Sequence, residues 1–193
     1  NDIEIVNIIL NFNSKPSFIN QISQEGTALN LAVMSNNVEI VKRLLSIKEI
    51  NPDLYGESGN TPLITAIENS RNIEIINAIF NFYSLNNKTS KCQFDMAFKM
   101  LINQYYEKNY SKEQYLNILS RFIEIDSFDV CHIDGFSFNL LINSCELNEI
   151  EVVEILIKYE KVDVNSYELL QGNTPLMVAI NENNLQIAKL LID

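Results

Sequence analysis

Glycine, proline and cysteine are all scarce in this sequence. The 193 residues include five glycines and four prolines, too few for a collagen-like, linker-rich or low-complexity chain, so we expect order nearly throughout. The three cysteines, Cys92, Cys131 and Cys145, form an odd set without C-x-x-C spacing, which favours neither a disulfide framework nor a zinc site. Unpaired cysteines are typical of a reducing intracellular compartment, and we expect the cytoplasm.

Basic residues are also few. The sequence has 14 Lys and Arg residues against 25 Asp and Glu, which gives a formal net charge of -11. Nucleic-acid binding normally requires a clustered basic face, so we expect no nucleic-acid partner, and the same charge disfavours anionic membrane surfaces. A partner protein with a basic surface is the expectation. No apolar run approaches the about 18–20 residues of a membrane span, so no membrane insertion is expected within these residues.

The usual catalytic and metal-binding motifs are missing as well. No G-x-S-x-G, H-E-x-x-H or Walker-type glycine loop occurs. The single histidine, His132, directly follows Cys131, and adjacent residues of an extended segment point to opposite sides, so we interpret the histidine as a surface residue. The acidic residues between positions 124 and 134 lack the spacing of a calcium loop. We therefore expect no enzyme activity, no catalytic residues, no cofactor and no metal.

What the sequence does contain is a repeat. Residues 59–80 read GNTPLITAIENSRNIEIINAIF, and residues 172–191 read GNTPLMVAINENNLQIAKLL. In each copy the threonine can cap a helix, and the following proline supplies the preset backbone of its first turn. After a polar break, apolar residues at helical spacing predict a second helix. Each copy is therefore a predicted helix–turn–helix unit.

The apolar pattern of the second helix recurs along the whole chain, even where TPL is lost. A fixed period in the range of about 20–50 residues indicates a repeat architecture. Subtraction of residue numbers gives intervals of 35, 35, 43, 34 and 35 between the first apolar positions of successive copies, which are Ile3, Val38, Ile73, Leu116, Ile150 and Leu185.

This unit resembles the ankyrin repeat, whose signature reads G-x-TPLHxAA. Ala66 and Ala179 hold a small-residue position, while Ile64 and Met177 stand in the histidine position. The resemblance implies an all-α fold, an ankyrin-repeat solenoid of stacked helix–turn–helix units with short β-turn fingers. It divides a single domain, 1–193, into a partial repeat at 1–20 and repeats at 21–53, 54–88, 89–128, 129–161 and 162–193. Because the sequence opens at Asn1 with only a second helix, we interpret it as a fragment.

The repeat at 89–128 is enlarged and divergent. Apolar residues at helical spacing run from Phe94 to Tyr105, well beyond a normal first helix, and a surplus of about eight residues predicts a longer helix and loop. Tyrosines at positions 105, 106, 110 and 115 either contact a partner or fill the space beneath the loop. We expect Tyr106 and Tyr110 to be the more exposed.

The repeat at 54–88 is closer to the pattern. It has one extra residue between its helices, which predicts a slightly longer turn around Ser70 and Arg71.

The resemblance implies a protein–protein interaction module, a scaffold or adaptor that binds its partner through a concave surface of finger tips and first-helix positions. Phe136 and Tyr167 are the positions to mutate first, because an aromatic residue in a finger has no core to enter. Two alternatives remain: a regulatory or targeting segment of a larger enzyme or channel, and a structural spacer. The candidate contacts by register are Met34, Ser35, Tyr55, Glu57, Ser58, Glu68, Asn69, Asp134, Phe136, Glu146, Leu147, Tyr167, Glu168, Asn181 and Glu182, together with Tyr106 and Tyr110.

Overall fold

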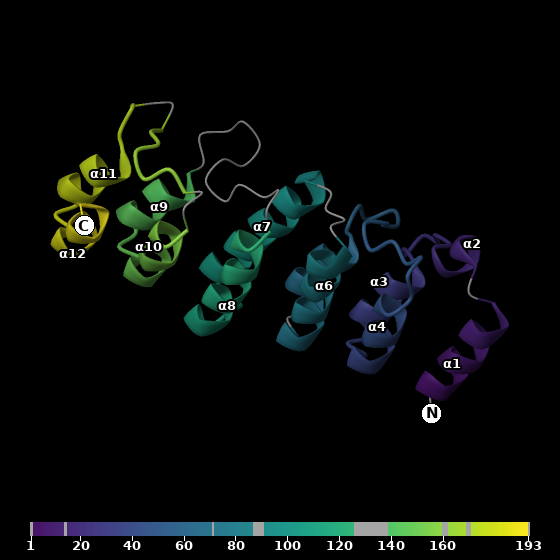
Figure 1. The fold of residues 1–193 in the computed structure, drawn as a ribbon. Helices are drawn as coiled ribbons and strands as arrows, with labels where there is room; N and C mark the ends of the chain where they lie inside the picture. The colour runs from purple at the N-terminus through teal and green to yellow at the C-terminus, as the bar shows by residue number, and fades with distance from the viewer. Residues whose placement is uncertain are drawn as a thin grey trace. The chain divides into compact units, whose positions relative to one another are not determined.

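The described part of the chain is helical. The computed structural model describes residues 2–13, 15–70, 72–86, 91–125, 139–159, 162–168 and 171–192. Within these ranges the only β-type pairing is an isolated antiparallel bridge between Ser23 and Gly26, and no strand forms there. The chain divides into two compact units, residues 1–121 and residues 122–193, and each is described by itself (Figure 1).

The first unit contains helix pairs followed by a longer pair. Its helices are α1 (Asp2–Phe12), α2 (Pro16–Ile19), α3 (Ala28–Met34), α4 (Val38–Leu45), α5 (Pro62–Thr65), the π-helical turn η1 (Ala66–Ser70), α6 (Ile73–Asn86), α7 (Lys91–Tyr106) and most of α8 (Lys112–Ile123). The second unit contains the end of α8 and two further pairs, which are α9 (Leu140–Glu146), α10 (Ile150–Ile157), α11 (Pro175–Asn181) and α12 (Leu185–Ile192).

The first helices α3, α5, α9 and α11 each begin at a side-chain cap, as the repeat pattern predicts. The Thr61 hydroxyl oxygen accepts a hydrogen bond from the Ile64 backbone N–H at 3.5 Å, and the hydroxyl of Thr174 accepts from Met177 at 3.4 Å. Where the motif is lost, Asn139 takes the same role and accepts from two backbone N–H groups at 3.0 and 3.2 Å. These caps satisfy amides that the first helical turn leaves unpaired, which fixes where each first helix starts.

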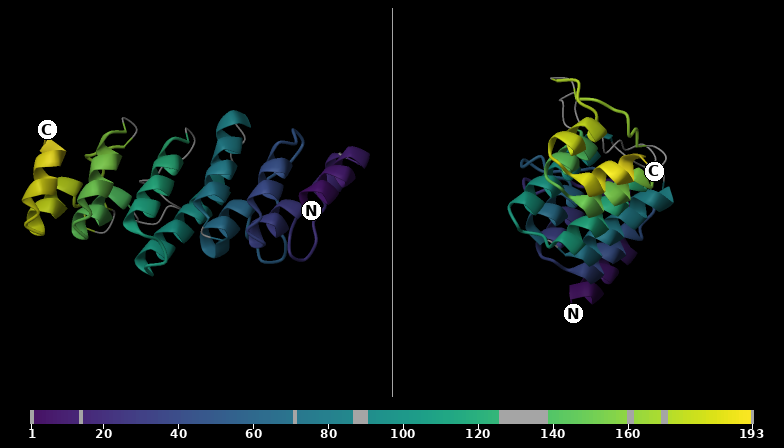
Figure 2. Two further views of the ribbon diagram at one scale, coloured as in Figure 1. Left: turned by 90° about the horizontal axis from the view of Figure 1, so that it is seen from below. Right: turned by 90° about the vertical axis from the view of Figure 1, so that its left-hand side faces the viewer.

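The core lies between two layers of helices within each unit. First helices contact first helices (α3 with α5, and α9 with α11), while second helices contact second helices (α4 with α6, and α10 with α12). Figure 2 shows these pairs from two further directions. The apolar stripes predicted for the second helices are buried in this core only in part, at Val41, Leu44, Ile75, Ile76, Ile79, Phe80, Val152, Val153, Leu156, Ile187 and Ala188. The first apolar position of each copy is half-buried or, at Leu185, exposed.

Asparagine side chains join neighbouring repeats at the turns between paired helices. Asn36 and Asn148 have positive φ angles of 54° and 57°, a left-handed conformation that asparagine tolerates better than most residues. The Asn72 amide donates to the Asn36 side-chain oxygen at 2.8 Å, and the Asn184 amide donates to that of Asn148 at 2.6 Å. In each unit, a hydrogen bond between two uncharged amide side chains thus links the turns of neighbouring repeats.

The two irregular features predicted from the sequence have different outcomes. The first helix of the enlarged repeat is indeed long, since α7 has 16 residues against seven in α3, α9 and α11. The prediction of a longer turn at Ser70 is wrong. Ser70 ends a π-helical turn, so the extra residue widens the last turn of the first helix instead. Arg71 lies outside the described residues.

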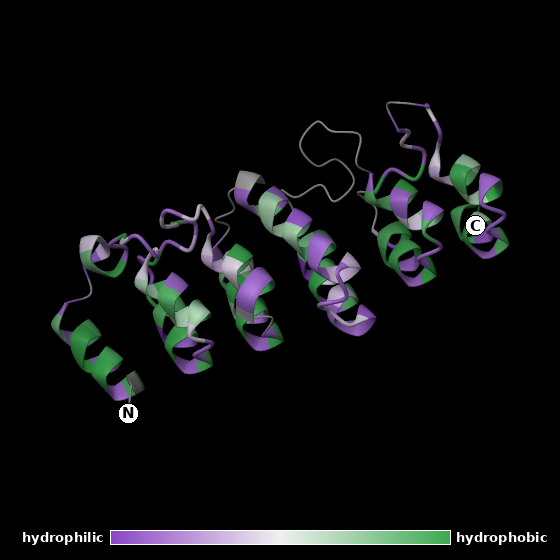
Figure 3. Ribbon diagram, turned by 180° about the vertical axis from the view of Figure 1, so that it is seen from behind, coloured by the Kyte–Doolittle hydropathy of each residue, from purple (hydrophilic) through white to green (hydrophobic). Residues whose placement is uncertain are grey.

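The N-terminal helix α1 is apolar over much of its surface (Figure 3). Its exposed side chains include Ile5, Ile8 and Phe12, while Leu10 is buried. No helix in the described part of the chain has the length and apolar character to cross a membrane.

Candidate functional site

The fingers of the first unit are held against each other by their backbones. The Glu57 N–H donates to the Gln24 carbonyl at 2.8 Å. At Gly56 the two fingers approach so closely that a Cβ atom would lie 2.3 Å from the Gln24 oxygen and 2.4 Å from the Gly26 nitrogen. Tyr55, which precedes this contact, is 47% exposed, and Glu57 and Ser58 after it are exposed. The contact therefore presents three of the predicted side chains from a fixed backbone.

Glu68 and Asn69 lie in η1, at the C-terminal end of the first helix that follows this finger. The Glu68 carboxylate is half-buried and accepts hydrogen bonds from the side-chain amides of Asn60 at 2.9 Å and Asn69 at 3.5 Å. The Asn60 carbonyl in turn accepts from the Asn30 amide of the preceding repeat at 3.1 Å. Hydrogen bonds to a carboxylate hold it in one orientation, so Glu68 is a positioned negative charge.

In the second unit, Tyr167 and Glu168 occupy one finger with different roles. Tyr167 is 63% exposed. Glu168 closes the finger on itself, because its backbone N–H donates to the Asn173 carbonyl at 3.1 Å and its carboxylate accepts from the Asn173 amide at 2.9 Å. Tyr167 is therefore free to contact a partner, whereas Glu168 is partly engaged within its own loop.

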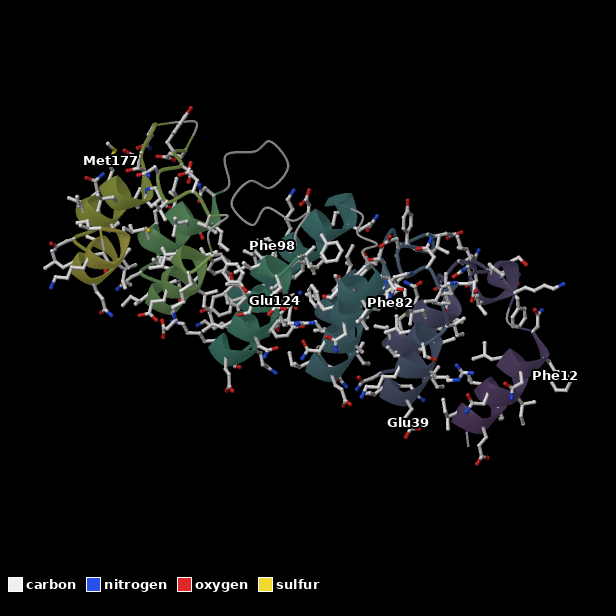
Figure 4. All side chains as sticks on the ribbon, in the orientation of Figure 1. Phe12, Glu39, Phe82, Phe98, Glu124 and Met177 are labelled. Atoms are coloured by element: carbon white, nitrogen blue, oxygen red, sulfur yellow. The ribbon has the colours of Figure 1, made fainter. Side chains whose placement is uncertain are left out.

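The predicted first-helix positions of the second unit are all exposed. Glu146 and Leu147 end α9, and Asn181 and Glu182 end α11. Two further exposed residues of α11, Met177 and Ile180, were not among the predicted contacts (Figure 4). Met177 holds the position of the signature histidine, and its exposure follows from the helical register of the capped helix that begins after Thr174.

The tyrosine cluster divides between surface and core. Tyr106 is 45% exposed, as predicted, but the prediction that Tyr110 is exposed is wrong, because only 4% of its surface is accessible. Its hydroxyl donates to the Ile67 carbonyl in η1 at 2.8 Å, so the loop after α7 folds back onto the preceding repeat. Tyr105 and Tyr115 stack with ring centroids 4.1 Å apart, with Tyr115 buried and Tyr105 half-buried.

The predicted finger residues Asp134 and Phe136 lie outside the described residues, as do Cys131 and His132.

The fingers and first helices also share a pattern of charge that the sequence analysis did not identify. Residues 21–37, 51–70, 139–147 and 162–182 contain the described fingers and first helices of the regular repeats, about a third of the chain, and none of the 14 Lys and Arg residues falls in them. Lys42, Arg43 and Lys189 lie in second helices instead. The signal was present in the sequence, but the basic residues were considered only for dense runs along the chain.

The described side chains offer little chemistry beyond binding. Burial, and secondarily the neighbouring charge of Glu146, raises the pKa of the Cys145 thiol to about 12. A buried thiol that stays protonated is a poor nucleophile. Burial also raises the pKa of Tyr83, with smaller contributions from the charge of Asp53 and the hydrogen bond to it. No group of side chains able to hold a metal ion occurs among the described residues.

Two hollows in the first unit lie away from most predicted contacts. The larger, of about 710 Å³, lies on the second-helix side between α4 and α6, where Leu45, Phe82 and Leu85 line it. The smaller, of about 390 Å³, is apolar and lies where α1 and α2 meet α3 and α4, with Ile9, Phe18 and Leu31 among its lining residues. Of the predicted contacts only Ser35 lines either hollow. We therefore build the candidate site on the exposed finger and first-helix residues and not on a cavity.

Comparison with known proteins agrees with this architecture. The family model described as ankyrin repeats (3 copies) matches residues 1–90 and 96–193. Comparison with curated proteins gives no significant match. Among solved structures, an ankyrin repeat domain from Acinetobacter baumannii AYE is similar with a TM-score of 0.65 and 19% identity, covering 99% of this chain and 91% of that one.

Two further solved structures are similar at the level of the fold. A chain from the complex of the Bdellovibrio bacteriovorus predatory endopeptidase Bd0816 with the immunity protein Bd3460 has a TM-score of 0.54 and 20% identity, covering 99% of this chain and 92% of that one. The ankyrin repeat domain of Bcl-3 has a TM-score of 0.58 and 18% identity, covering 98% and 78%. The helix pairs, their caps and the family match together show an all-α ankyrin-repeat solenoid, and the chain belongs to the ankyrin-repeat family.

Proposed function

We propose that this chain is a protein–protein interaction module that binds a partner protein through its fingers and first helices. Ankyrin repeats are generally interaction modules, and the fold is typically non-catalytic. The finger–helix surface of the first unit consists of Leu31, Met34, Tyr55, Glu57, Ser58, Glu68 and Asn69, and that of the second unit consists of Glu146, Leu147, Tyr167, Met177, Ile180, Asn181 and Glu182.

The observation that carries this proposal is the exposure of large apolar and aromatic side chains on the fingers and first helices. Tyr55 and Tyr167 protrude from fingers, and Met34 and Met177 protrude from first helices. Tyrosine brings a large contact area with little loss of rotamer entropy, and methionine adapts to varied apolar partners. A structural spacer has no use for such residues on its surface, so they favour binding over the spacer alternative.

A cytoplasmic location is part of the proposal. It is supported by Cys145, which is unpaired and buried in α9, because free thiols persist in reducing compartments.

Random peptides displayed on phage and selected against the immobilised chain provide the test. We expect hydrogen-exchange mapping to show that selected peptides protect fingers and first helices. Tyr55→Ala should weaken binders of the first unit roughly fivefold or more, as truncation of an aromatic contact does. Leu85→Ala is the matched control, because Leu85 is 85% exposed but belongs to the second helix α6. Protection confined to second helices, or equal losses for the two variants, would refute the proposed surface.

A further inference from the structure

Most charged residues near the ends of the second helices follow the helix dipole, although α6 and α10 have no basic residue in the last turn and Glu154 lies in the last turn of α10. An acidic residue near the N-terminus and a basic residue near the C-terminus both stabilise a helix, because the helix carries partial positive charge at its start and partial negative charge at its end. The second helices have acidic residues in the first turn at Glu39, Glu74, Glu113 and Glu151, and basic residues in the last turn at Lys42, Arg43, Arg121 and Lys189.

The first helices of the regular repeats have the opposite arrangement. None of α3, α5, α9 and α11 has a basic residue in its last turn. Glu146 is the last residue of α9, Glu182 follows the end of α11, and Glu68 lies in the π-helical turn that extends α5. Negative charge at these ends is unfavourable for the helix itself. Helix stability therefore does not explain these three glutamates.

Four carboxylates of the fingers and first helices lack an ion-pair partner among the described residues. Glu57, Glu68, Glu146 and Glu182 form no ion pair with any described residue, while on the second-helix side Lys42 pairs with Glu74. Glu57 and Glu182 are exposed, and Glu68 is held in place by the amide of Asn60. The fingers and first helices thus present negative charge that forms no ion pair within the described part of the chain.

In the first unit this uncompensated charge lies among exposed apolar side chains. Tyr55 is two residues from Glu57 in the same finger, while Leu31 and Met34 are exposed on α3, which contacts both α5 and η1. A surface that combines acidic and apolar groups is complementary to a chain that combines basic and apolar groups, and it repels phosphate backbones and anionic lipids.

We propose that the finger–helix surface of the first unit binds a segment of a partner protein in which Lys or Arg alternates with apolar side chains. This inference rests on the proposed function, since it names the chemistry of the partner for the same surface. Tyr55, Met34 and Leu31 receive the apolar side chains, and Glu57 and Glu68 receive the cations.

Two variants with the same change in net charge test the assignment. Glu57→Gln with Glu68→Gln removes two charges from the finger–helix surface, and glutamine keeps an oxygen that can accept the Asn60 amide. Glu39→Gln with Glu49→Gln also removes two exposed charges. Glu39 lies within the second helix α4 (Figure 4), and Glu49 follows four residues after its end. The probes are peptides selected from two phage libraries, one containing Lys and Arg and one in which glutamine replaces both.

We expect the Lys- and Arg-containing library to yield the tighter binders and hydrogen exchange to place them on the fingers and first helices. Glu57→Gln with Glu68→Gln should weaken them on the order of threefold to tenfold, since each exposed pair contributes modestly, and the control should weaken them less than about twofold. Added salt should also reduce affinity, because it screens the attraction between exposed charges.

The opposite outcomes separate the two proposals. If the library without Lys and Arg binds the same surface equally well, or if both double variants weaken binding equally, the inference about the partner is wrong and the interaction module stands. If binders from both libraries protect only second helices, or if neither library gives a binder, both proposals are wrong.

Discussion

Tyr110→Phe tests whether the hydrogen bond of Tyr110 holds the loop of the enlarged repeat against the preceding repeat. The substitution removes one buried oxygen and leaves the ring, so the lost interaction is the 2.8 Å hydrogen bond from the Tyr110 hydroxyl to the Ile67 carbonyl. Both residues are buried, and water cannot readily replace the donor. Losing a buried hydrogen bond and leaving its acceptor unsatisfied costs about 1–3 kcal/mol. For a chain of this size that corresponds to a decrease in Tm of roughly 2–10 °C.

Tyr55→Phe is the matched control, because it removes the same hydroxyl from a ring that is 47% exposed. Its effect on the free energy of unfolding should stay within about 0.5 kcal/mol. Urea denaturation followed by far-UV circular dichroism compares the two variants with the unmodified chain, and hydrogen exchange at the end of η1 localises the change. If the two substitutions lower stability equally, or if Tyr110→Phe has no effect, the contact does not hold the loop.

Three further predictions concern Gly56, Glu182 and Cys145. Gly56→Ala should destabilise the first unit by about 1–3 kcal/mol in urea denaturation, because the new Cβ would overlap the backbone of the neighbouring finger at 2.3–2.4 Å, and an unchanged midpoint would mean that the fingers are not in contact. Glu182→Lys should raise the free energy of unfolding by about 0.6–2 kcal/mol, since it replaces an unfavourable charge at a helix C-terminus with a favourable one, and a loss of stability would contradict the dipole argument. With Cys92 and Cys131 replaced by serine, the Cys145 thiol should react with a thiol reagent at pH 8 only after unfolding. Because burial raises its pKa from 9.0 to about 12, the unfolded chain loses the proton first, so its contribution to stability is present below pH 9 and falls between pH 9 and 12.

The sequence was most informative for features that depend on residues only a few positions apart. Thr61 and Thr174 were predicted as caps from TPL alone, and the structure confirms both. The long first helix of the enlarged repeat followed from an apolar period that continues to Tyr105. These features depend on neighbours a few residues away, so periodicity and capping preferences are sufficient to predict them.

Tyr110 and the extra residue near Ser70 could not be predicted in the same way. Tyr110 contacts a carbonyl 43 positions earlier in the chain, and helical spacing carries no information beyond the end of α7. The extra residue could enter either the turn or the helix, because a count of residues between two motifs does not distinguish them. In the structure the extra residue lies in the helix, within the widened turn that contains Ile67, whose carbonyl accepts the hydrogen bond from Tyr110.

The abundance of asparagine gives the charge pattern a structural basis. Neighbouring repeats are joined by apolar packing and by neutral amides, as in the bonds from Asn30 to Asn60, from Asn72 to Asn36 and from Asn184 to Asn148, and on the second-helix side also by the ion pair of Lys42 with Glu74. Because the amide links need no ion pairs, the exposed acidic residues Glu57, Glu146 and Glu182 are not required to hold the repeats together, whereas Glu68 also positions Asn60 in one of these links. Salt screens charges but leaves neutral hydrogen bonds and apolar contacts largely intact. Stacking and partner binding therefore depend on different interactions, and the acidity of the finger–helix surface can match a partner without weakening the contacts between repeats.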